Sequence, residues 1–238
     1  MTDEAPTLPR RFYKKATLAA RDEGFGVALD VRTLRTPGGA VFVAPTQALA
    51  ALCAGEWEAQ GEFIVPATMP ICQLAFATLD WTMKNRDQLA DYVARFGETD
   101  LCCHRAEAPV ELAGRQAERW DRIVTWAKQE LSVELPVVTG IIAAKVDARA
   151  IAKIRDHAAR LDDFRLTALS QASGLAGSAL IGFGVVHNFL NASEAFEVAA
   201  LDNLWSIEHW GEDGEARARL DRQRREFQDI TRYLEALH

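Results

Sequence analysis

The period of the hydrophobic pattern changes once along this chain, and the change constrains the fold more than any other feature. Between residues 11 and about 44, short apolar runs at 12–20, 25–29 and 41–43 are separated by turn signals, which is typical of strands. From about residue 71 onward, apolar residues recur every three or four positions, which is typical of helices. The sequence therefore predicts an α+β protein, with a small N-terminal β-rich domain followed by a larger all-α domain.

Capping residues mark where several helices should begin. Thr46 precedes an amphipathic stretch that runs to Gln60, and Asp147 precedes another. Asn191 stands three residues before Glu194, which is the spacing of a capping box. We expect two domains, a β-rich one with a single helix over residues 1–70 and a helical one over residues 71–238.

Composition narrows the class of protein. The chain has 238 residues, 49% of them hydrophobic, so it can bury a substantial core. A net charge of -7 argues against nucleic-acid binding. The longest apolar run, residues 174–186, has 13 residues including four glycines, while a membrane span needs about 20. It predicts a buried helix and no stable membrane insertion.

The first ten residues, MTDEAPTLPR, have neither the apolar core of a signal peptide nor the Arg-rich, acid-poor composition of a transit peptide. We therefore expect a cytoplasmic protein, or a mitochondrial matrix protein if the chain is a mature eukaryotic form. The four cysteines (Cys53, Cys72, Cys102 and Cys103) include no C-x-x-C pair, so reduced thiols without a metal are expected.

Motifs for catalysis or cofactor binding are missing from the pattern. The glycines of residues 174–184 lack both a preceding strand and a Gly-Lys-Ser/Thr ending, which a phosphate loop requires. No Gly-x-Ser-x-Gly elbow is present. The sequence predicts a protein that is not an enzyme and that holds no nucleotide, cofactor or metal.

One helical segment has apolar residues on two sides. If residues 196–212 form a continuous helix, a stripe of five residues faces the core: Phe196, Ala200, Leu204, Ile207 and Trp210. The opposite side carries Leu201, Trp205, Glu208 and Glu212. Either the helix is buried on both sides, or the second side binds a partner. From these residues alone, burial is the favoured interpretation.

Short motifs in a fixed order then resemble a known family. Their residues run from position 11 to position 212: Arg11-Phe12-Tyr13-Lys14, Leu29-Asp30-Val31-Arg32, Leu34-Arg35-Thr36-Pro37, Glu56-Trp57-Glu58-Ala59-Gln60, Ile64-Val65-Pro66, Met69-Pro70, Thr99-Asp100-Leu101, Trp120-Asp121 and Trp210-Gly211-Glu212. Together they resemble the assembly chaperones of F-type ATP synthase that bind the alpha subunit of its catalytic head.

The resemblance implies a function without catalysis. A free alpha subunit exposes the apolar surface that later packs against beta subunits, and such surfaces aggregate. A chaperone would cover that surface and release the subunit to beta. Given the resemblance, we favour Leu201, Trp205, Glu208 and Glu212 as the partner-binding face, with the apolar anchors supplying affinity and the carboxylates selecting a basic partner.

Two alternatives remain. A small-molecule enzyme could have its site between the domains, with Asp30, Arg32, Asp80 and Asp100 as candidate groups. These residues could equally close turns and cap helices. The chain could also be an interaction module of another oligomeric complex.

Overall fold

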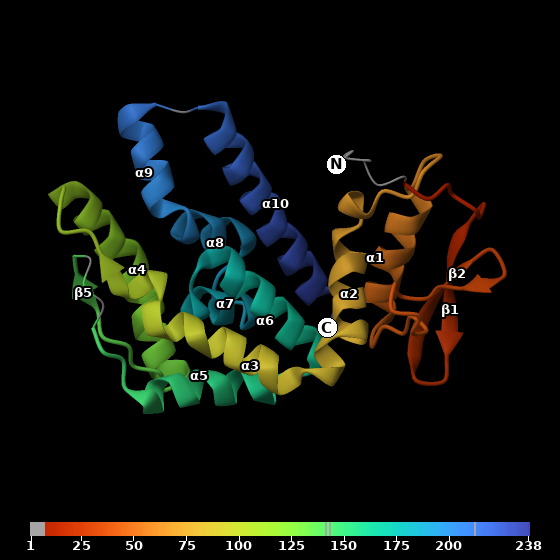
Figure 1. The fold of residues 1–238 in the computed structure, drawn as a ribbon, viewed down its shortest axis with the longest axis horizontal. Coiled ribbons are helices and arrows are strands. Elements are labelled where there is room, and N and C mark those ends of the chain that lie inside the picture. The colour runs from red at the N-terminus through yellow and green to blue at the C-terminus, as the bar shows by residue number, and fades with distance from the viewer. Residues whose placement is uncertain (1–7, 141, 143, 212) are drawn as a thin grey trace, which may run out of the picture. The chain divides into compact units, whose positions relative to one another are not determined.

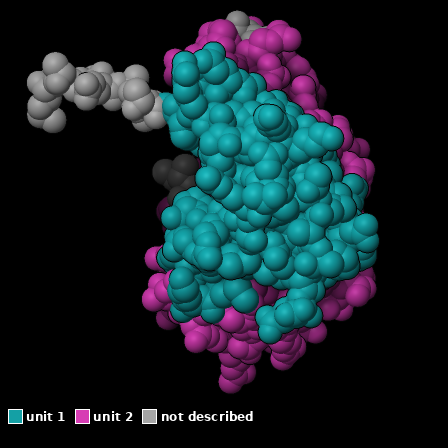
Figure 2. All heavy atoms as spheres, turned by 90° about the vertical axis from the view of Figure 1, so that its right-hand side faces the viewer, with its two compact units in different colours: residues 1–84, 232–238 teal, residues 85–231 magenta. Residues whose placement is uncertain are grey.

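A computed structural model of the chain describes residues 8–140, 142, 144–211 and 213–238. The fold has a small antiparallel sheet near the N-terminus and is otherwise mostly helical, which confirms the α+β class expected from the sequence (Figure 1). The chain forms two compact units, coloured separately in Figure 2. Unit 1 comprises residues 1–84 and 232–238, and unit 2 comprises residues 85–231. The division into domains 1–70 and 71–238 remains a prediction.

The sheet of unit 1 has the order β1-β2-β3 (β1, Ala16–Arg21; β2, Gly24–Leu29; β3, Arg32–Thr33). The β1–β2 pair is antiparallel, from Ala16 opposite Leu29 to Arg21 opposite Gly24. Residues 12–15, which the sequence pattern assigns to the first strand, precede it. The expected strand at 41–43 is reduced to isolated bridges, Arg35 to Val41 and Phe25 to Ala44.

Helices α1 (Gln47–Glu58) and α2 (Pro70–Asp80) complete unit 1 together with the last residues of the chain. The side chain of Thr46 accepts a hydrogen bond from the N–H of Leu49, which confirms the predicted cap of α1. Helix α1 packs against β1, β2 and α2. At the C-terminal end of the chain, the Tyr233 hydroxyl lies 3.0 Å from that of Thr78 on α2.

Unit 2 is built around α7 (Ala179–Val186), all of whose residues are buried. Helices α4 (Val110–Glu130), α6 (Asp163–Ala176) and α8 (Ala192–Ala199) pack against it (Figure 1). The apolar run at 174–186 thus spans the end of α6 and the whole of α7. The two helices are joined at Gly177, whose φ of 65° lies in the left-handed region that glycine favours.

The other elements of unit 2 surround this centre. Helix α3 (Arg86–Arg95) packs on α5 (Ala148–Arg160) and α6, and Asp147 caps α5 as predicted by accepting from the N–H of Arg149. Strands β4 (His104–Arg105) and β5 (Val138–Thr139) form a short parallel pair. Short 3₁₀ helices occupy Pro66–Thr68, Thr82–Lys84, Phe96–Thr99 and Leu101–Cys103.

The segment considered above as one continuous helix from residue 196 onward belongs to two helices. Asn191 and Glu194 form the predicted capping box at the start of α8. The backbone then leaves helical geometry at Ala200 (φ -98°, ψ 7°), and α9 runs from Leu201 to Trp210. Because α9 starts anew, the angular positions predicted for a continuous helix do not apply to it. The last helix, α10, spans Gly214–Glu235.

In the described part of the chain, every helix is too short or too polar to span a lipid bilayer.

Candidate functional site

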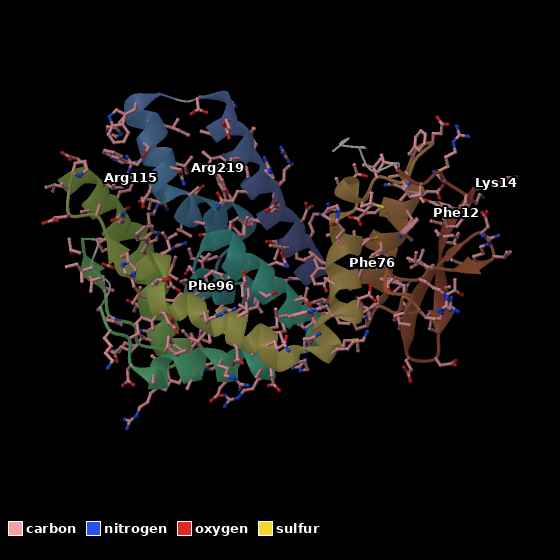
Figure 3. All side chains as sticks on the ribbon, viewed as in Figure 1. Phe12, Lys14, Phe76, Phe96, Arg115 and Arg219 are labelled. Carbon is pink, nitrogen blue, oxygen red and sulfur yellow. The ribbon has the colours of Figure 1, made fainter. Side chains whose placement is uncertain are left out.

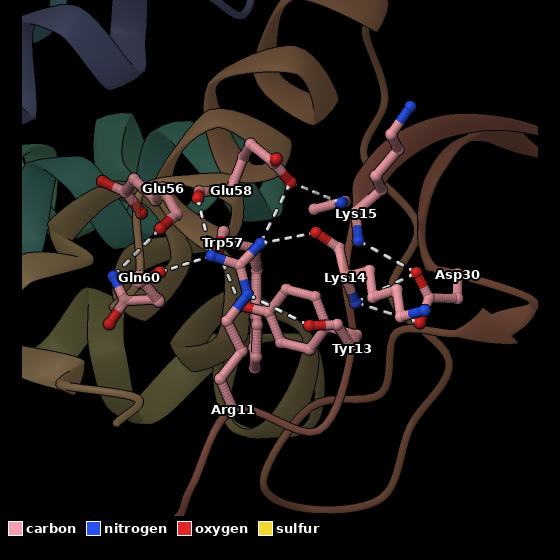
Figure 4. A network of polar contacts seen from close by, with 10 residues as sticks. Arg11, Tyr13, Lys14, Lys15, Asp30, Glu56, Trp57, Glu58 and Gln60 are labelled. Carbon is pink, nitrogen blue, oxygen red and sulfur yellow. Dashed lines mark hydrogen bonds and ion pairs between the residues drawn. The ribbon is translucent and has the colours of Figure 1, made fainter. Parts of the chain in front are cut away.

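Most of the motifs that carry the family resemblance hold the fold together. The Arg11 guanidinium donates to the carbonyls of Glu58 and Gln60 at the C-terminal end of α1 and to those of Tyr13 and Lys14 in its own segment (Figure 4). Carbonyls at a helix end lack intrahelical partners, so this arginine caps α1 and fixes the N-terminal segment across it. The Tyr13 hydroxyl also donates to the carbonyl of Trp57, at 2.6 Å.

Carboxylates of the same motifs cap helix N-termini or close turns. Glu56 accepts from the N–H groups of Ile71 and Cys72 at the start of α2. Asp100 is buried and accepts from the Ser178 hydroxyl and the N–H of Leu180 at the start of α7. Burial raises the pKa of the Asp100 carboxyl, and these hydrogen bonds oppose the rise. Their role is structural.

The structure corrects the predicted exposure of α9. Leu201 and Trp205, which the continuous-helix pattern turns toward water, are each only 4% exposed. Trp210, which the same pattern assigns to the core, is 74% exposed. The helix break at Ala200 explains the difference, because it resets the direction of every α9 side chain relative to α8.

Three aromatic rings gather at the C-terminal end of α9. Trp205 stacks on His209 with ring centroids 4.0 Å apart, and Trp210 contacts Trp205 edge-on at 5.1 Å. His209 Nδ1 lies 2.8 Å from the carbonyl oxygen of Trp205, which can only accept, so Nδ1 carries a proton. We call His209 and Trp210, both exposed, together with exposed Glu208, the α9 tip. Trp205 is the buried platform beneath it.

Ion pairs hold α9 and α8 against α4. Three arginines spaced along α4 each bind one glutamate (Arg115 with Glu208 at 2.6 Å, Arg119 with Glu197 at 3.1 Å, Arg122 with Glu194 at 3.2 Å). Figure 3 labels Arg115 on this helix. Glu208 is therefore exposed but already paired with a cation on α4.

Acidic residues continue beyond the α9 tip. Residues 208–215 include four carboxylates and no lysine or arginine: Glu208, Glu212, Asp213 and Glu215. Glu212, the fourth member of the predicted binding face, lies outside the described residues. Gly211 has a φ of 86° and ends α9 directly after Trp210. A tryptophan just before a helix-ending glycine is the sequence signal that could have identified Trp210 as exposed.

The residues considered for an enzyme site make structural contacts at separate places. Asp30 accepts from the N–H groups of Lys14 and Lys15, which lowers its pKa. Asp80 accepts from the Thr36 hydroxyl and the N–H of Gly38. Arg32 lies over the Phe12 ring, 5.9 Å from its centroid. The four cysteines are buried and free, and no group of three metal-binding side chains occurs among the described residues.

A cavity of about 300 Å³ lies in unit 2 beside α5. Two of its lining side chains contact nearby carbonyls: Lys153 donates to that of Ser132, and His157 Nε2 lies 2.8 Å from that of Leu131. Acidic residues Glu130 and Asp156 also line it. This mixture of charges gives the cavity no clear ligand class.

The α9 tip has the composition of a protein-binding surface. Large exposed aromatic side chains beside charged groups are typical of such surfaces, and tryptophan is the residue most enriched at their energetic centres. The geometry therefore points to a class of proteins that act by binding other proteins.

Comparison with known proteins identifies the family. The sequence profile of the ATP12 chaperone protein family matches residues 10–128. Crystal-structure matches include Atp12 from Paracoccus denitrificans, at 34% identity and a TM-score of 0.91 over 97% of this chain and 99% of that one. An aspartate-to-lysine mutant of the Paracoccus protein matches equally, over 97% and 98%. The chain belongs to the ATP12 chaperone family, as its sequence motifs indicate.

The chain is also similar to a curated eukaryotic protein. The mitochondrial protein atp12 of Schizosaccharomyces pombe is 25% identical over 219 residues, which cover 85% of this chain and 74% of the relative.

Proposed function

We propose that this chain is an assembly chaperone that binds the unassembled alpha subunit of F-type ATP synthase, prevents its aggregation and releases it to beta subunits. Membership of the ATP12 chaperone family and the close structural match to Atp12 from Paracoccus denitrificans support the proposal. The bacterial relative suggests that this chain acts in the bacterial cytoplasm.

We further propose that the α9 tip contacts the client. The single observation that supports this most strongly is the 74% exposure of Trp210 on top of the buried Trp205 ring. A tryptophan supported from below loses little conformational freedom on binding, so its burial would contribute strongly to affinity. Leu201 and Trp205, buried in the free protein, then act as the support of the site, while Glu208 and, by its place in the sequence, Glu212 would supply the charges for the client.

Charge would give this site its selectivity. The carboxylates of residues 208–215 would attract a basic region of the client and disfavour acidic partners. Glu208 would exchange part of its contact with Arg115 for a client cation. A tip of this size should bind more weakly than the extensive alpha–beta interface, which permits release without ATP hydrolysis.

The enzyme alternative gains no support from the site geometry. Its candidate carboxylates, Asp30, Asp80 and Asp100, each accept hydrogen bonds from backbone N–H groups. A catalytic carboxylate needs a free oxygen directed at substrate. The family is one of chaperones, and non-enzymatic action is part of our proposal.

Capture of alpha subunit by purified variants tests the site. Trp210→Ala should lower capture at least tenfold, because truncation of a central aromatic anchor commonly costs about 2 kcal/mol or more. Trp81→Ala is the matched control, since Trp81 is also an exposed tryptophan, at 45%, but belongs to unit 1. Glu212→Lys should weaken capture as well, with little change in melting temperature. Normal capture by folded Trp210→Ala and Glu212→Lys proteins would exclude the α9 tip as the client site.

A further inference from the structure

Strand β1 is an unprotected sheet edge. It pairs with β2 on one side, and the described part of the chain supplies no strand on the other. Its register with β2 is continuous over six residues, so no bulge interrupts it. Residues 16–20 include neither a proline nor a charge. Sheet edges normally carry bulges, prolines or charges that prevent pairing with another chain, and β1 has none of these over five residues.

The hydrogen-bonding groups available on this edge follow from the ladder. The N–H of Asp30 donates to the carbonyl of Lys15, and the two-residue turn at 22–23 is closed by the pair Arg21 and Gly24. In an antiparallel ladder hydrogen-bonded pairs alternate, so Thr17, Ala19 and Arg21 bond to β2. The backbone groups of Ala16, Leu18 and Ala20 therefore point away from the sheet.

One apolar side chain also remains uncovered on this edge. Leu18 stands opposite Val27, which is fully buried, so it lies on the core face of the sheet. It is nevertheless 42% exposed, because no strand of the described residues follows β1 on that side. A strand added to β1 would cover Leu18 and extend the core face.

We propose that β1 pairs antiparallel with β1 of a second copy of this chain, joining two three-stranded sheets into one. The proposal is independent of client binding. Its geometry follows from the outward groups: about a two-fold axis at Leu18, the leucines of both copies face each other, and Ala16 of each faces Ala20 of the other. The Leu18 pair can exchange two backbone hydrogen bonds. In each Ala16–Ala20 pair the N–H of Ala20 can donate to the carbonyl of Ala16, while the N–H of Ala16 already donates to Glu58.

Charge complementarity favours a second copy as the occupant. In this register Lys14, two residues before β1, comes next to Asp22, the turn residue that follows β1 of the other copy, and both side chains are exposed. Lys14 is labelled next to Phe12 in Figure 3, on the segment that leads into β1. Arg21 would stand opposite Lys15, which carries the same charge. The Arg21 side chain is directed toward its own sheet, however, because its Nη2 donates to the Thr33 hydroxyl at 2.8 Å. The strand ends are thus self-complementary.

The dimer should be weak. One strand pair buries less surface than the roughly 1,200–2,000 Å² of a standard stable interface, so association should depend on protein concentration. Opposite charges and an apolar pair at the centre supply specificity for this register.

Sedimentation velocity of the full chain over a concentration series tests the proposal. The wild-type protein should shift from monomer toward dimer as concentration rises. Leu18→Lys places like charges opposite each other at the axis and should raise the dimer dissociation constant at least about tenfold. Thr17→Lys is the matched control, because Thr17 is the exposed neighbour whose backbone bonds to β2, and it should dimerise nearly as the wild type does. Melting curves should confirm that both variants fold.

The register has its own test. Lys14→Asp and Asp22→Lys should each weaken the dimer, and the double variant should restore it. A wild-type protein that stays monomeric at every concentration would overturn the proposal, as would a dimer that Leu18→Lys leaves intact. If the wild type is monomeric and Leu18→Lys loses alpha-subunit capture, the edge serves the client and not a second copy. Normal alpha-subunit capture by Trp210→Ala, which would exclude the α9 tip as the client site, would leave this proposal unaffected.

Discussion

Arg11 illustrates how a motif residue acts in this protein at the scale of one side chain. Its guanidinium serves carbonyls of two chain segments and pairs with the Glu58 carboxylate at 3.4 Å. A lysine ammonium has three donors and no planar fork, so it cannot satisfy the same set of acceptors.

Arg11→Lys should lower the free energy of unfolding by about 1–3 kcal/mol, because carbonyls at the end of α1 lose their partner. Urea unfolding measures the change. Arg10→Lys is the control: Arg10 is exposed and paired with Glu62, and its replacement should change stability by no more than about 0.5 kcal/mol. Equal effects of the two changes would show that the Arg11 network does not stabilise the fold.

Trp205 and Trp210 have different roles in the proposed client site. Trp205 supports the α9 tip from below, and Trp210 contacts the client. Trp205→Ala should remove roughly 3–5 kcal/mol of stability, because the side chain is buried. Trp210→Ala should barely change stability, because most of its surface is already in water. Thermal or urea unfolding of the two variants gives the comparison. A large stability loss for Trp210→Ala would contradict the assignment of Trp210 as an exposed anchor.

At the scale of elements, capping residues in the sequence predict where helices begin, but the sequence does not predict where packing interrupts a helix. Thr46, Asp147 and Asn191 cap helices as the sequence indicated, because a capping side chain bonds to backbone only two or three residues away. Ala200 gave no such signal. Alanine has the highest helix propensity, so the turn there must come from packing, which a single sequence does not display.

The binding face itself remains a prediction, but the exposure that periodicity assigned to the α9 side chains is wrong. One continuous helix would turn Leu201 and Trp205 toward water and Trp210 toward the core. Because the helix breaks at Ala200, Leu201 and Trp205 are buried and Trp210 is exposed. Likewise, the helical period from residue 71 onward does not indicate that residues 232–238 join unit 1. Periodicity reports which side of a helix is apolar, not what covers it.

The capping box of α8 makes a prediction about pH. The N–H of Asn191 and, to a lesser extent, Arg122 lower the pKa of Glu194 below its ordinary value. A depressed folded-state pKa contributes stability above the unfolded pKa, about 4.3, that is lost as the pH falls through the folded value. The stability difference between wild type and Glu194→Gln should therefore be constant near neutral pH and shrink below about pH 4.3. Urea unfolding across this range measures it; a difference independent of pH would refute the role of the carboxylate.

At the scale of the whole molecule, two units could divide the work of a chaperone. Unit 2 carries the α9 tip, with its exposed tryptophan and carboxylates. Unit 1 carries the Arg11 network and the β1 edge. A client site in one unit and a self-pairing edge in the other would let association between copies and client binding vary independently.

The central claim is that the chain protects an unassembled alpha subunit and gives it up to beta. The most direct measurement is light scattering of purified alpha subunit diluted from denaturant, with and without this protein, followed by addition of beta subunit. We predict suppressed scattering at near-stoichiometric chaperone, transfer of alpha to an alpha–beta complex after beta is added, and weak suppression by Trp210→Ala. Unchanged aggregation in the presence of excess folded wild-type protein would contradict the account.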